Sequence, residues 1–350
     1  MNKSTRNVII LAGIAVFVFI AIWGGVTLTR NVGKDPEVLS NESAANSLDD
    51  IYNNIRVSEE TPPMGLDTVT TSDADTLPDI SKYPPQVDKT TDSFIEIFSS
   101  TEKAGTGADA WMTDMANEFN EAGITVNGKP VSVRLRGIAS GEGMDYISTG
   151  KYIPDVYTPS NELWGEMLKA KGVTVTLAEK RIAGNVTGVL FSKSKNDELI
   201  KKYGSINLKI IVDAIDNKEI LMGYTNPFAS STGLNFLVSA LLTFDSANPL
   251  SDTAVAAFEK FQTNIPFVAY TTLQMRESAK SGALDGFILE NQIFYNSPEL
   301  QSDYIFTPFG ARHDSPVYEI GTLSAEKKQI LKEFIAYCNS EQSQEKATEY

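Results

Sequence analysis

Three consecutive units, each made of a short apolar stretch, a polar turn and an amphipathic stretch, begin near residue 93. The first unit has the mostly apolar stretch 94–98, and its later apolar residues Trp111, Met115 and Phe119 lie four positions apart. Short apolar runs are typical of buried strands, and a four-residue spacing is typical of one face of a helix. Strand, turn and helix in succession predict an α/β fold with a parallel sheet.

The same order recurs with an alternating apolar and polar strand at 131–136 and further strands at 155–157 and 220–224, and a later strand at 285–290 ends on a carboxylate. Ligands of parallel α/β sheets bind outside the carboxyl ends of the strands. We therefore expect a ligand-binding site built from the residues that follow these strands: Ser99, Ser100, Thr101, Ser140, Gly141, Thr158, Ser160, Asn161, Asn226, Ser230, Ser231, Thr232 and Glu290.

Hydroxyl and amide groups dominate these turns, and each turn precedes a predicted helix. The N-terminus of a helix favours negative charge, so the turns are suited to hold a small anion. The alternative is that Ser, Thr and Asn only cap the helices. Both interpretations remain open at the level of the sequence.

A run of 21 residues without a charge begins at Val8 and ends at Leu28. A helix of this length spans the roughly 30 Å hydrocarbon core of a bilayer. Lys3 and Arg6 precede the run, so we expect a cytoplasmic N-terminus and an extracytoplasmic remainder. Residues 1–30 are thus predicted to be a retained, single-pass membrane anchor. A cleaved signal peptide is the alternative, and a lipoprotein anchor is excluded because no cysteine lies near residue 20.

Residues 31–92 are rich in Ser, Thr, Asn, Asp and Pro, and acidic residues outnumber basic ones. Such a segment buries too little apolar surface to offset the entropy of ordering it. We expect an acidic flexible linker over 31–92, which joins the anchor to a folded domain over 93–350.

Across the whole chain, 45 acidic residues face 30 basic ones, for a formal net charge of −15. This charge disfavours nucleic acid as a partner. The chain has one cysteine, Cys338, and one histidine, His313, which excludes cysteine- or histidine-rich metal sites. We expect no metal and no cofactor. Cys338 lies on an apolar helical stripe and is predicted to be a core residue, whereas His313 is expected in a solvated loop.

An enzymatic function has little support in the sequence. The pattern Ser-x-x-Lys occurs at Ser100, Ser192, Ser324 and Ser343. A pattern that recurs this often in one chain is weak evidence for a catalytic serine. The companion motifs Ser-Asp-Asn and Lys-Thr-Gly, and a Gly-x-Ser-x-Gly motif, are absent from the sequence. We therefore predict that the protein is not an enzyme.

The order of elements from Ser93 to Tyr350 resembles bacterial extracellular solute-binding proteins with the type II periplasmic-binding-protein fold, nearest to the molybdate- and phosphate-receptor branch. The polar turn after the first strand, the turn 226–233 before an apolar helix, the stretch 279–287 and the closing helix with Phe334 carry the resemblance.

This resemblance implies two lobes that close around a ligand by a hinge motion. The two crossovers between them are expected near 184–194 and 286–296. Lobe 1 would then cover about 93–187 and 295–350, and lobe 2 about 188–294.

Together these features predict a membrane-tethered, extracytoplasmic solute-binding protein, which presents a small ligand to the membrane subunits of an ABC transporter. A small oxyanion is the first expectation for the ligand. A sugar or peptide is the alternative, with aromatic faces from Trp111, Tyr157 and Trp164. A cell-surface adhesion or sensing module without a transport role is the competing function. The chain ends at Tyr350 without a clear helix cap, which leaves a further domain open.

Overall fold

The computed structural model describes residues 74–88 and 90–350. The apolar run that ends at Leu28 and the first part of the expected linker lie outside these residues. Among the residues that the structure describes, no helix is both long enough and apolar enough to cross a membrane.

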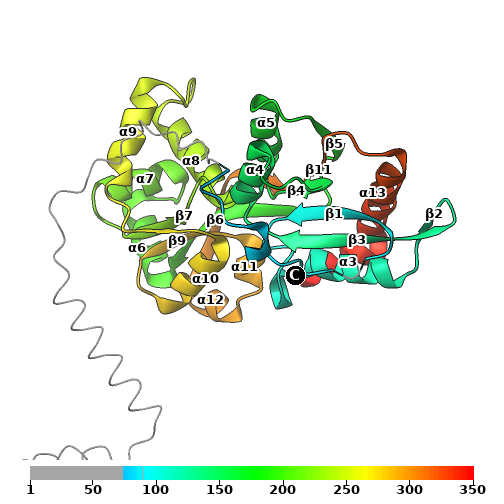
Figure 1. The fold of residues 1–350 in the computed structure, drawn as a ribbon. Helices are drawn as coiled ribbons and strands as arrows, with labels where there is room; N and C mark the ends of the chain where they lie inside the picture. The colour runs from blue at the N-terminus through cyan, green and yellow to red at the C-terminus, as the bar shows by residue number, and fades with distance from the viewer. Residues whose placement is uncertain (1–73, 89) are drawn as a thin grey trace, which may run out of the picture. The chain divides into compact units, whose positions relative to one another are not determined.

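Two β-sheets form the centres of two lobes (Figure 1). The lobe 1 sheet has the strand order β2-β3-β1-β4-β11-β5. Strand β1 pairs in parallel with β3 and with β4, which confirms the predicted parallel arrangement. The bounds of these strands are β1 (Ser93–Ser99), β2 (Thr125–Val126), β3 (Lys129–Gly137), β4 (Val156–Thr158), β5 (Val175–Glu179) and β11 (Val317–Ile320).

The lobe 2 sheet has the strand order β10-β6-β9-β7-β8. Strand β7 is parallel to β8 and β9, whereas β6 is antiparallel to β9 and β10. The bounds are β6 (Gly184–Ser192), β7 (Met222–Thr225), β8 (Phe267–Ala269), β9 (Gly286–Glu290) and β10 (Tyr304–Asp314).

Helices cover both faces of each sheet. The lobe 1 helices are η2 (Gly107–Asp109), α3 (Trp111–Glu121), α4 (Ser140–Thr149), α5 (Leu163–Ala170), α13 (Ala325–Cys338), α14 (Glu341–Lys346) and η3 (Ala347–Glu349). The lobe 2 helices are α6 (Lys193–Tyr203), α7 (Leu208–Asp216), α8 (Ser231–Phe244), α9 (Asp252–Gln262), α10 (Thr272–Ser281), α11 (Asn291–Tyr295) and α12 (Pro298–Asp303).

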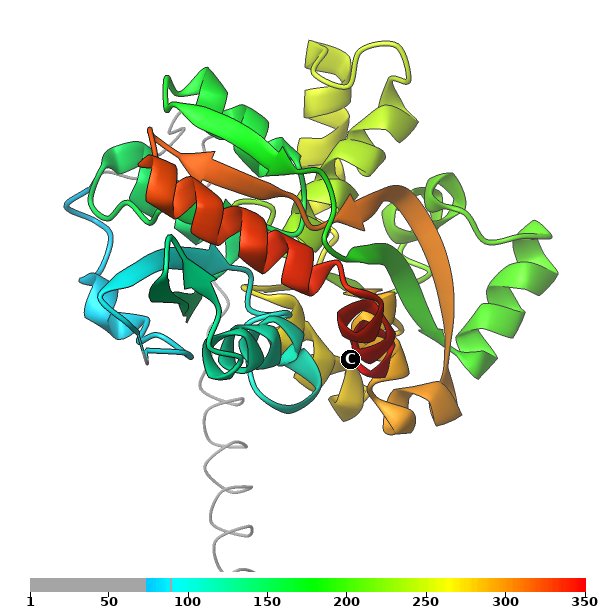
Figure 2. The same ribbon diagram turned by 90° about the vertical axis from the view of Figure 1, so that its right-hand side faces the viewer.

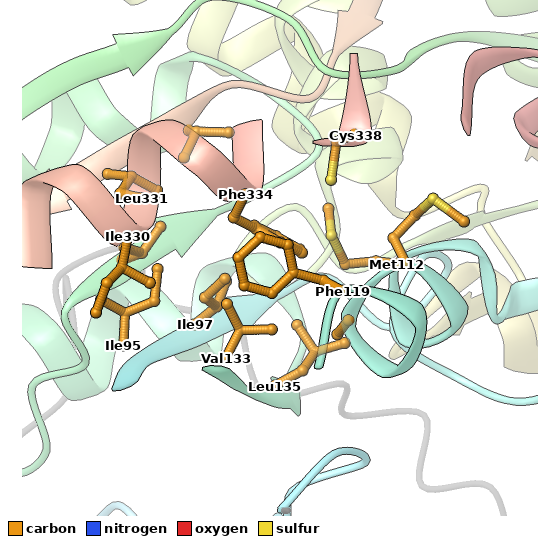
Figure 3. Close-up of a cluster of buried hydrophobic side chains, with 14 of the residues drawn as sticks. Ile95, Ile97, Met112, Phe119, Val133, Leu135, Ile330, Leu331, Phe334 and Cys338 are labelled. Atoms are coloured by element: carbon orange, nitrogen blue, oxygen red, sulfur yellow. The ribbon is translucent and has the colours of Figure 1, made fainter. Parts of the chain in front are cut away.

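Alternating side chains of each strand supply two apolar cores, one on each face of the sheet. In lobe 1, Ile97 of β1 belongs to the core under α3 and α13, and its neighbour Phe98 belongs to the core under α4 and α5. Figure 2 shows α13 lying across the lobe 1 sheet. Phe119 of α3 meets Phe334 of α13 edge to face, with ring centroids 5.4 Å apart (Figure 3). Cys338 is fully buried in this core, as predicted, and burial raises the pKa of its thiol.

The chain crosses from lobe 1 to lobe 2 between β5 and β6, next to the expected stretch 184–194. It returns between β10 and β11, not near the expected stretch 286–296. The reason is that β10 pairs along β6 and so extends the lobe 2 sheet before the chain leaves. Lobe 2 therefore comprises residues 184–314, and lobe 1 comprises the described residues before and after this range.

The prediction of a solvated loop at His313 is wrong. His313 lies in β10 and is fully buried, and its ring contacts Thr187 of β6 and Asn235 of α8. A residue on an exposed loop would gain no such partners, so this histidine is part of the interior of lobe 2.

Residues 74–88, here called the N-terminal strap, pack against lobe 1, although they belong to the segment expected to be a linker. Val87 forms an antiparallel bridge with Leu135 of β3. The guanidinium group of Arg136 donates to the carbonyl oxygens of Tyr83 and Ile80. These contacts satisfy backbone groups of the strap, so the folded unit begins well before Ser93.

Candidate ligand-binding site

An interlobe pocket lies where the first turns of three helices meet. Helices α4, α8 and α10 begin at Ser140, Ser231 and Thr272, and all three residues line the pocket. The pocket holds about 230 Å³ of empty volume. Its lining residues come from both lobes: Thr101, Glu102, Ala139, Ser140, Ala229, Ser230, Ser231, Thr271, Thr272 and Glu290.

The helix starts provide hydrogen-bond donors and a favourable potential for negative charge. Ser230 and Thr271 cap α8 and α10 by accepting from the backbone amides of Gly233 and Gln274. The hydroxyl of Thr272 lines the pocket and has no hydrogen-bond partner among the described residues, although the residue is only 3% exposed. This hydroxyl is therefore available to donate to a ligand in the pocket.

A chain of side-chain hydrogen bonds forms the lobe 1 side of the site. The ammonium group of Lys103 donates to the Ser100 hydroxyl at 2.6 Å and to the carbonyl oxygen of Thr158 at 2.9 Å. The hydroxyls of Ser100 and Ser160 are 2.7 Å apart, and Ser160 donates to the carboxylate of Glu102. This order commits the protons of both serine hydroxyls to protein acceptors.

Glu290, at the carboxyl end of β9, forms the centre of the lobe 2 side. Its Oε1 accepts from the hydroxyl of Thr232, and His313 Nδ1 lies 3.3 Å from the same oxygen. Asn185 Nδ2 is 3.5 Å from its other oxygen, Oε2. Glu290 is 1% exposed, so its carboxylate is withdrawn from bulk water and directed to the pocket.

Direct hydrogen bonds join the two lobes at the rim of the pocket. The indole Nε1 of Trp164 donates to Ser231 at 2.9 Å, and Ser231 donates to Ser140 at 3.2 Å. The backbone amide of Gly141 donates to the carbonyl oxygen of Ala229 at 2.9 Å. The lobes are therefore closed on each other along α4 and the start of α8.

An ion pair reinforces this closure on another side. The guanidinium group of Arg276 on α10 lies 3.1 Å from the carboxylate of Asp109 in η2. Burial raises the pKa of Asp109, and the charge of Arg276 opposes that rise. The ion pair thus connects the lobe 2 helix that starts at the pocket with lobe 1.

Burial dominates the electrostatics of the two ionisable groups in the lobe 1 chain. It raises the pKa of Glu102, and the nearby charge of Glu290 raises that pKa further. Burial lowers the pKa of Lys103 to about 8, although the carboxylates of Glu102 and Glu290 pull that pKa upwards.

The lowered pKa of Lys103 has a measurable consequence. Between pH 8 and its ordinary pKa of 10.5, the unfolded chain holds the lysine proton more tightly than the folded chain does. Stability therefore rises with pH in this window. We expect the unfolding free energy of the wild type to increase relative to that of Lys103→Met between pH 8 and pH 10.5. Urea unfolding of both proteins across this range measures the difference, and parallel curves would contradict the prediction.

The structure separates the predicted site residues into three groups. Those that line the pocket are Thr101, Ser140, Ser230, Ser231 and Glu290. Gly141, Ser160 and Thr232 are hydrogen-bonded directly to residues that line the pocket, and Ser100 is bonded to Ser160. Those that serve the local backbone or the lobe 1 interior are Ser99, Thr158, Asn161 and Asn226.

The last group shows where helix capping and turn formation were the better interpretation. The side-chain oxygen of Asn161 accepts from the amide of Leu163, and that of Asn226 accepts from the amide of Phe228. The hydroxyls of Ser99 and Thr158 are buried and have no hydrogen-bond partner in residues 74–88 and 90–350, and Thr158 contributes to a separate apolar cavity in lobe 1.

Sequence analysis missed Glu102, Thr271 and Thr272 as pocket residues. Glu102 directly follows the predicted turn residues 99–101, so a predicted turn longer by one residue would have included it. Thr271 and Thr272 come shortly after the short strand β8, as Ser230 and Ser231 come shortly after β7. The same pattern of a strand followed by hydroxyl residues was therefore present at residues 267–272.

Comparisons with known proteins agree with this architecture. The family model for bacterial extracellular solute-binding proteins matches residues 103–350. A search of curated proteins finds no match to the chain.

Several solved structures share the fold. The sulfate-binding protein SubI from Mycobacterium tuberculosis H37Rv has 12% identity and a TM-score of 0.51, over 73% of this chain and 85% of that one. AfuA from Actinobacillus pleuropneumoniae, with fructose-6-phosphate bound, has 13% identity and a TM-score of 0.51, over 74% and 82%. Iron-bound HitA from Pseudomonas aeruginosa has 14% identity and a TM-score of 0.50, over 72% and 83%. At these identities the similarity establishes the fold alone, which is the two-lobed periplasmic-binding-protein fold.

Proposed function

Because the chain belongs to the bacterial extracellular solute-binding proteins, we propose that it captures a small ligand between its lobes and presents it to an ABC transporter. Members of this family are binding components of transport and not enzymes. The observation that carries the proposal is the interlobe pocket, which both lobes line with polar groups at the starts of three helices. An adhesion module, which binds its partner through a surface, has no need of such a pocket.

For the ligand, the helix starts favour a group with anionic oxygens, and a small oxyanion is the simplest example. We propose that Thr101, Ser140, Ser230 and Thr272 supply hydroxyl donors to it. The aromatic alternative loses its support, because Trp111, Tyr157 and Trp164 are buried and none of them lines the pocket. A sugar stacked on an aromatic face therefore has no platform in this pocket.

The test of the proposed function is ligand capture by the full chain. We expect one or more small molecules from a metabolite extract, or a defined oxyanion such as sulfate or molybdate, to raise the melting temperature. A ligand at 100 times its dissociation constant adds about 2.7 kcal/mol of stability. Thr272→Val keeps the shape of the side chain and removes its free hydroxyl, so binding should weaken about tenfold.

The matched control is Thr243→Val on α8. Its hydroxyl donates to the carbonyl oxygen of Ala240 within the same helix and does not line the pocket. Affinity should not change in this variant. A protein that captures no small molecule under these conditions would contradict the proposed function.

We further propose that the run from Val8 to Leu28 anchors the protein in the cell membrane, with the binding domain outside. The support is the length of the apolar run and the position of Lys3 and Arg6 before it. Protease added to intact cells, or to protoplasts where a wall intervenes, should cut before residue 74 and release a folded fragment that keeps the strap. Full protection of the chain, while another extracytoplasmic protein is digested in the same sample, would overturn the proposed topology.

A further inference from the structure

Two carboxylates line the interlobe pocket, one from each lobe. Glu102 of lobe 1 is 6% exposed and Glu290 of lobe 2 is 1% exposed. Among the ten described residues that line the pocket, none is Lys, Arg or His. The donors at the helix starts therefore share the pocket with two acidic acceptors.

The nearby lysine does not provide a donor to the pocket. The ammonium group of Lys103 has three N–H donors. It has three acceptors within lobe 1: Ser100 Oγ at 2.6 Å, the carbonyl oxygen of Thr158 at 2.9 Å and Ser160 Oγ at 3.4 Å. All its protons are thus occupied. Within the described part of the chain, neither Glu102 nor Glu290 forms an ion pair with a Lys or Arg side chain.

The histidine beside Glu290 is also accounted for by its hydrogen bonds. The amide oxygen of Asn235 accepts from the backbone amide of Ala311, and its Nδ2 lies 3.1 Å from His313 Nε2. The same ring nitrogen is 2.9 Å from the Thr187 hydroxyl, and Nδ1 is 3.3 Å from Glu290 Oε1. His313 therefore contacts Glu290 from the interior of lobe 2 and is not one of the residues that line the pocket.

Several hydroxyls near the pocket are unavailable to an anion. Ser160 and Thr232 donate to the carboxylates of Glu102 and Glu290, and Ser231 donates to Ser140. The free hydroxyl of Thr272 and the starts of α4, α8 and α10 remain for anionic oxygens. The pocket accordingly has one region suited to anionic oxygens and another suited to a cationic donor.

We infer that the ligand is a small zwitterion, with an ammonium or similar cationic donor at Glu102 and Glu290 and an anionic oxygen group at the helix starts. This inference rests on the proposed function and specifies the chemical class of the ligand. An ammonium group would replace the hydration that both carboxylates lose on burial.

The two simpler ligand classes fit the pocket less well. A doubly charged inorganic oxyanion would lie against two carboxylates without a countercharge in the lining. A bare metal ion would need more ligands, since the described part of the chain holds no group of three or more His, Cys, Asp or Glu residues suited to a metal. A metal ion would also leave the helix starts and the Thr272 hydroxyl without a partner.

The experiment compares matched probes on the full chain by calorimetric titration. Glycine, β-alanine and γ-aminobutyrate provide both charges at increasing separation, acetate and methylammonium provide one charge each, and sulfate and molybdate provide only negative charge. We expect a zwitterion to bind at least ten times more tightly than either single-charge probe. Glu290→Gln and Glu102→Gln should each weaken this binding at least tenfold, whereas Glu198→Gln on the exposed face of α6 should leave it unchanged.

Mass spectrometry of small molecules released from the extract-treated protein gives an independent answer. A captured molecule with both a cationic and an anionic group supports the inference. A captured molecule with anionic groups alone, or sulfate binding that Glu290→Gln strengthens, overturns the inference and leaves the proposed function intact. Capture of no molecule at all would instead overturn the proposed function. Melting curves without ligand show whether each Gln variant folds. Because Glu102 belongs to lobe 1 and Glu290 to lobe 2, the two variants test the two sides of the pocket separately.

Discussion

Gly141→Ala should hold the two lobes apart and weaken ligand binding by about 100-fold. A Cβ atom at Gly141 would lie 1.8 Å from the carbonyl oxygen of Phe228 and 2.9 Å from the Cα atom of Ala229. Both are backbone atoms of the opposite lobe, so no side chain can rotate to remove the clash. If the closed state becomes rare, the apparent affinity falls in proportion to its population.

Small-angle X-ray scattering and calorimetric titration measure closure and affinity separately in this variant. Gly143→Ala is the matched control, because its Cβ would meet side chains of Ile138 and Tyr157 within lobe 1 at 3.2 Å. That variant should lose some stability but keep its affinity within about threefold. If Gly141→Ala scattered and bound ligand like the wild type, the close contact between the lobes would not be required for binding.

Arg136→Met should lower the unfolding free energy by about 3–5 kcal/mol, since it leaves a buried carboxylate without its partner. Arg136 on β3 contacts Glu96 on β1 through two nitrogens, at 2.9 Å and 3.1 Å. The two side chains are only 7% and 10% exposed. Arg136 also donates to two carbonyl oxygens of the N-terminal strap, so the strap should become sensitive to protease in the same variant.

Urea unfolding and limited proteolysis measure these two effects. The double variant Arg136→Met with Glu96→Gln should regain part of the lost stability, because no unpaired charge is left. An exposed pair provides the second control, and Lys169→Met, which removes the partner of Glu166, should change stability by less than about 1 kcal/mol. Equal losses in the single and double variants would show that the unpaired charge is not the cause.

Hydrophobic periodicity was sufficient to predict most of the strands and helices that position the pocket. Strands β1, β4 and β9 are short, mostly apolar and largely buried, and such runs are recognisable in the sequence. Strand β3 was recognisable because its apolar residues alternate with polar ones. Strand β10 is different: only His313 of it is fully buried, it contains Pro308 and Gly310, and its register with β6 is irregular between Pro308 and Arg312. A strand at the edge of a sheet tolerates such residues, so its sequence resembles a loop. Because β10 was not predicted, the return crossover was expected too early in the chain and His313 was expected in a loop.

Part of the candidate site followed from the polar turns, and the remainder depended on tertiary contacts. Ser140, Ser230 and Ser231 were predicted because hydroxyls at helix starts are visible in the sequence. The chain from Lys103 through Ser100 to Ser160 was not predicted, because residues 103 and 160 come together only when β1 and β4 pair. The Ser-x-x-Lys pattern at Ser100 was not taken as a catalytic motif. In the structure, the Lys103 ammonium group donates a hydrogen bond to the Ser100 hydroxyl within lobe 1.

The N-terminal strap attaches the chain that precedes it to lobe 1. A pull on the preceding chain would be applied to lobe 1 through the strap. Lobe 2 would be pulled only through the two crossovers that connect it to lobe 1. Tyr83 of the strap donates to Glu142 in the first turn of α4, and Tyr270 of lobe 2 interacts with the same carboxylate. A force that withdrew Tyr83 would therefore act first on the helix that starts at the pocket.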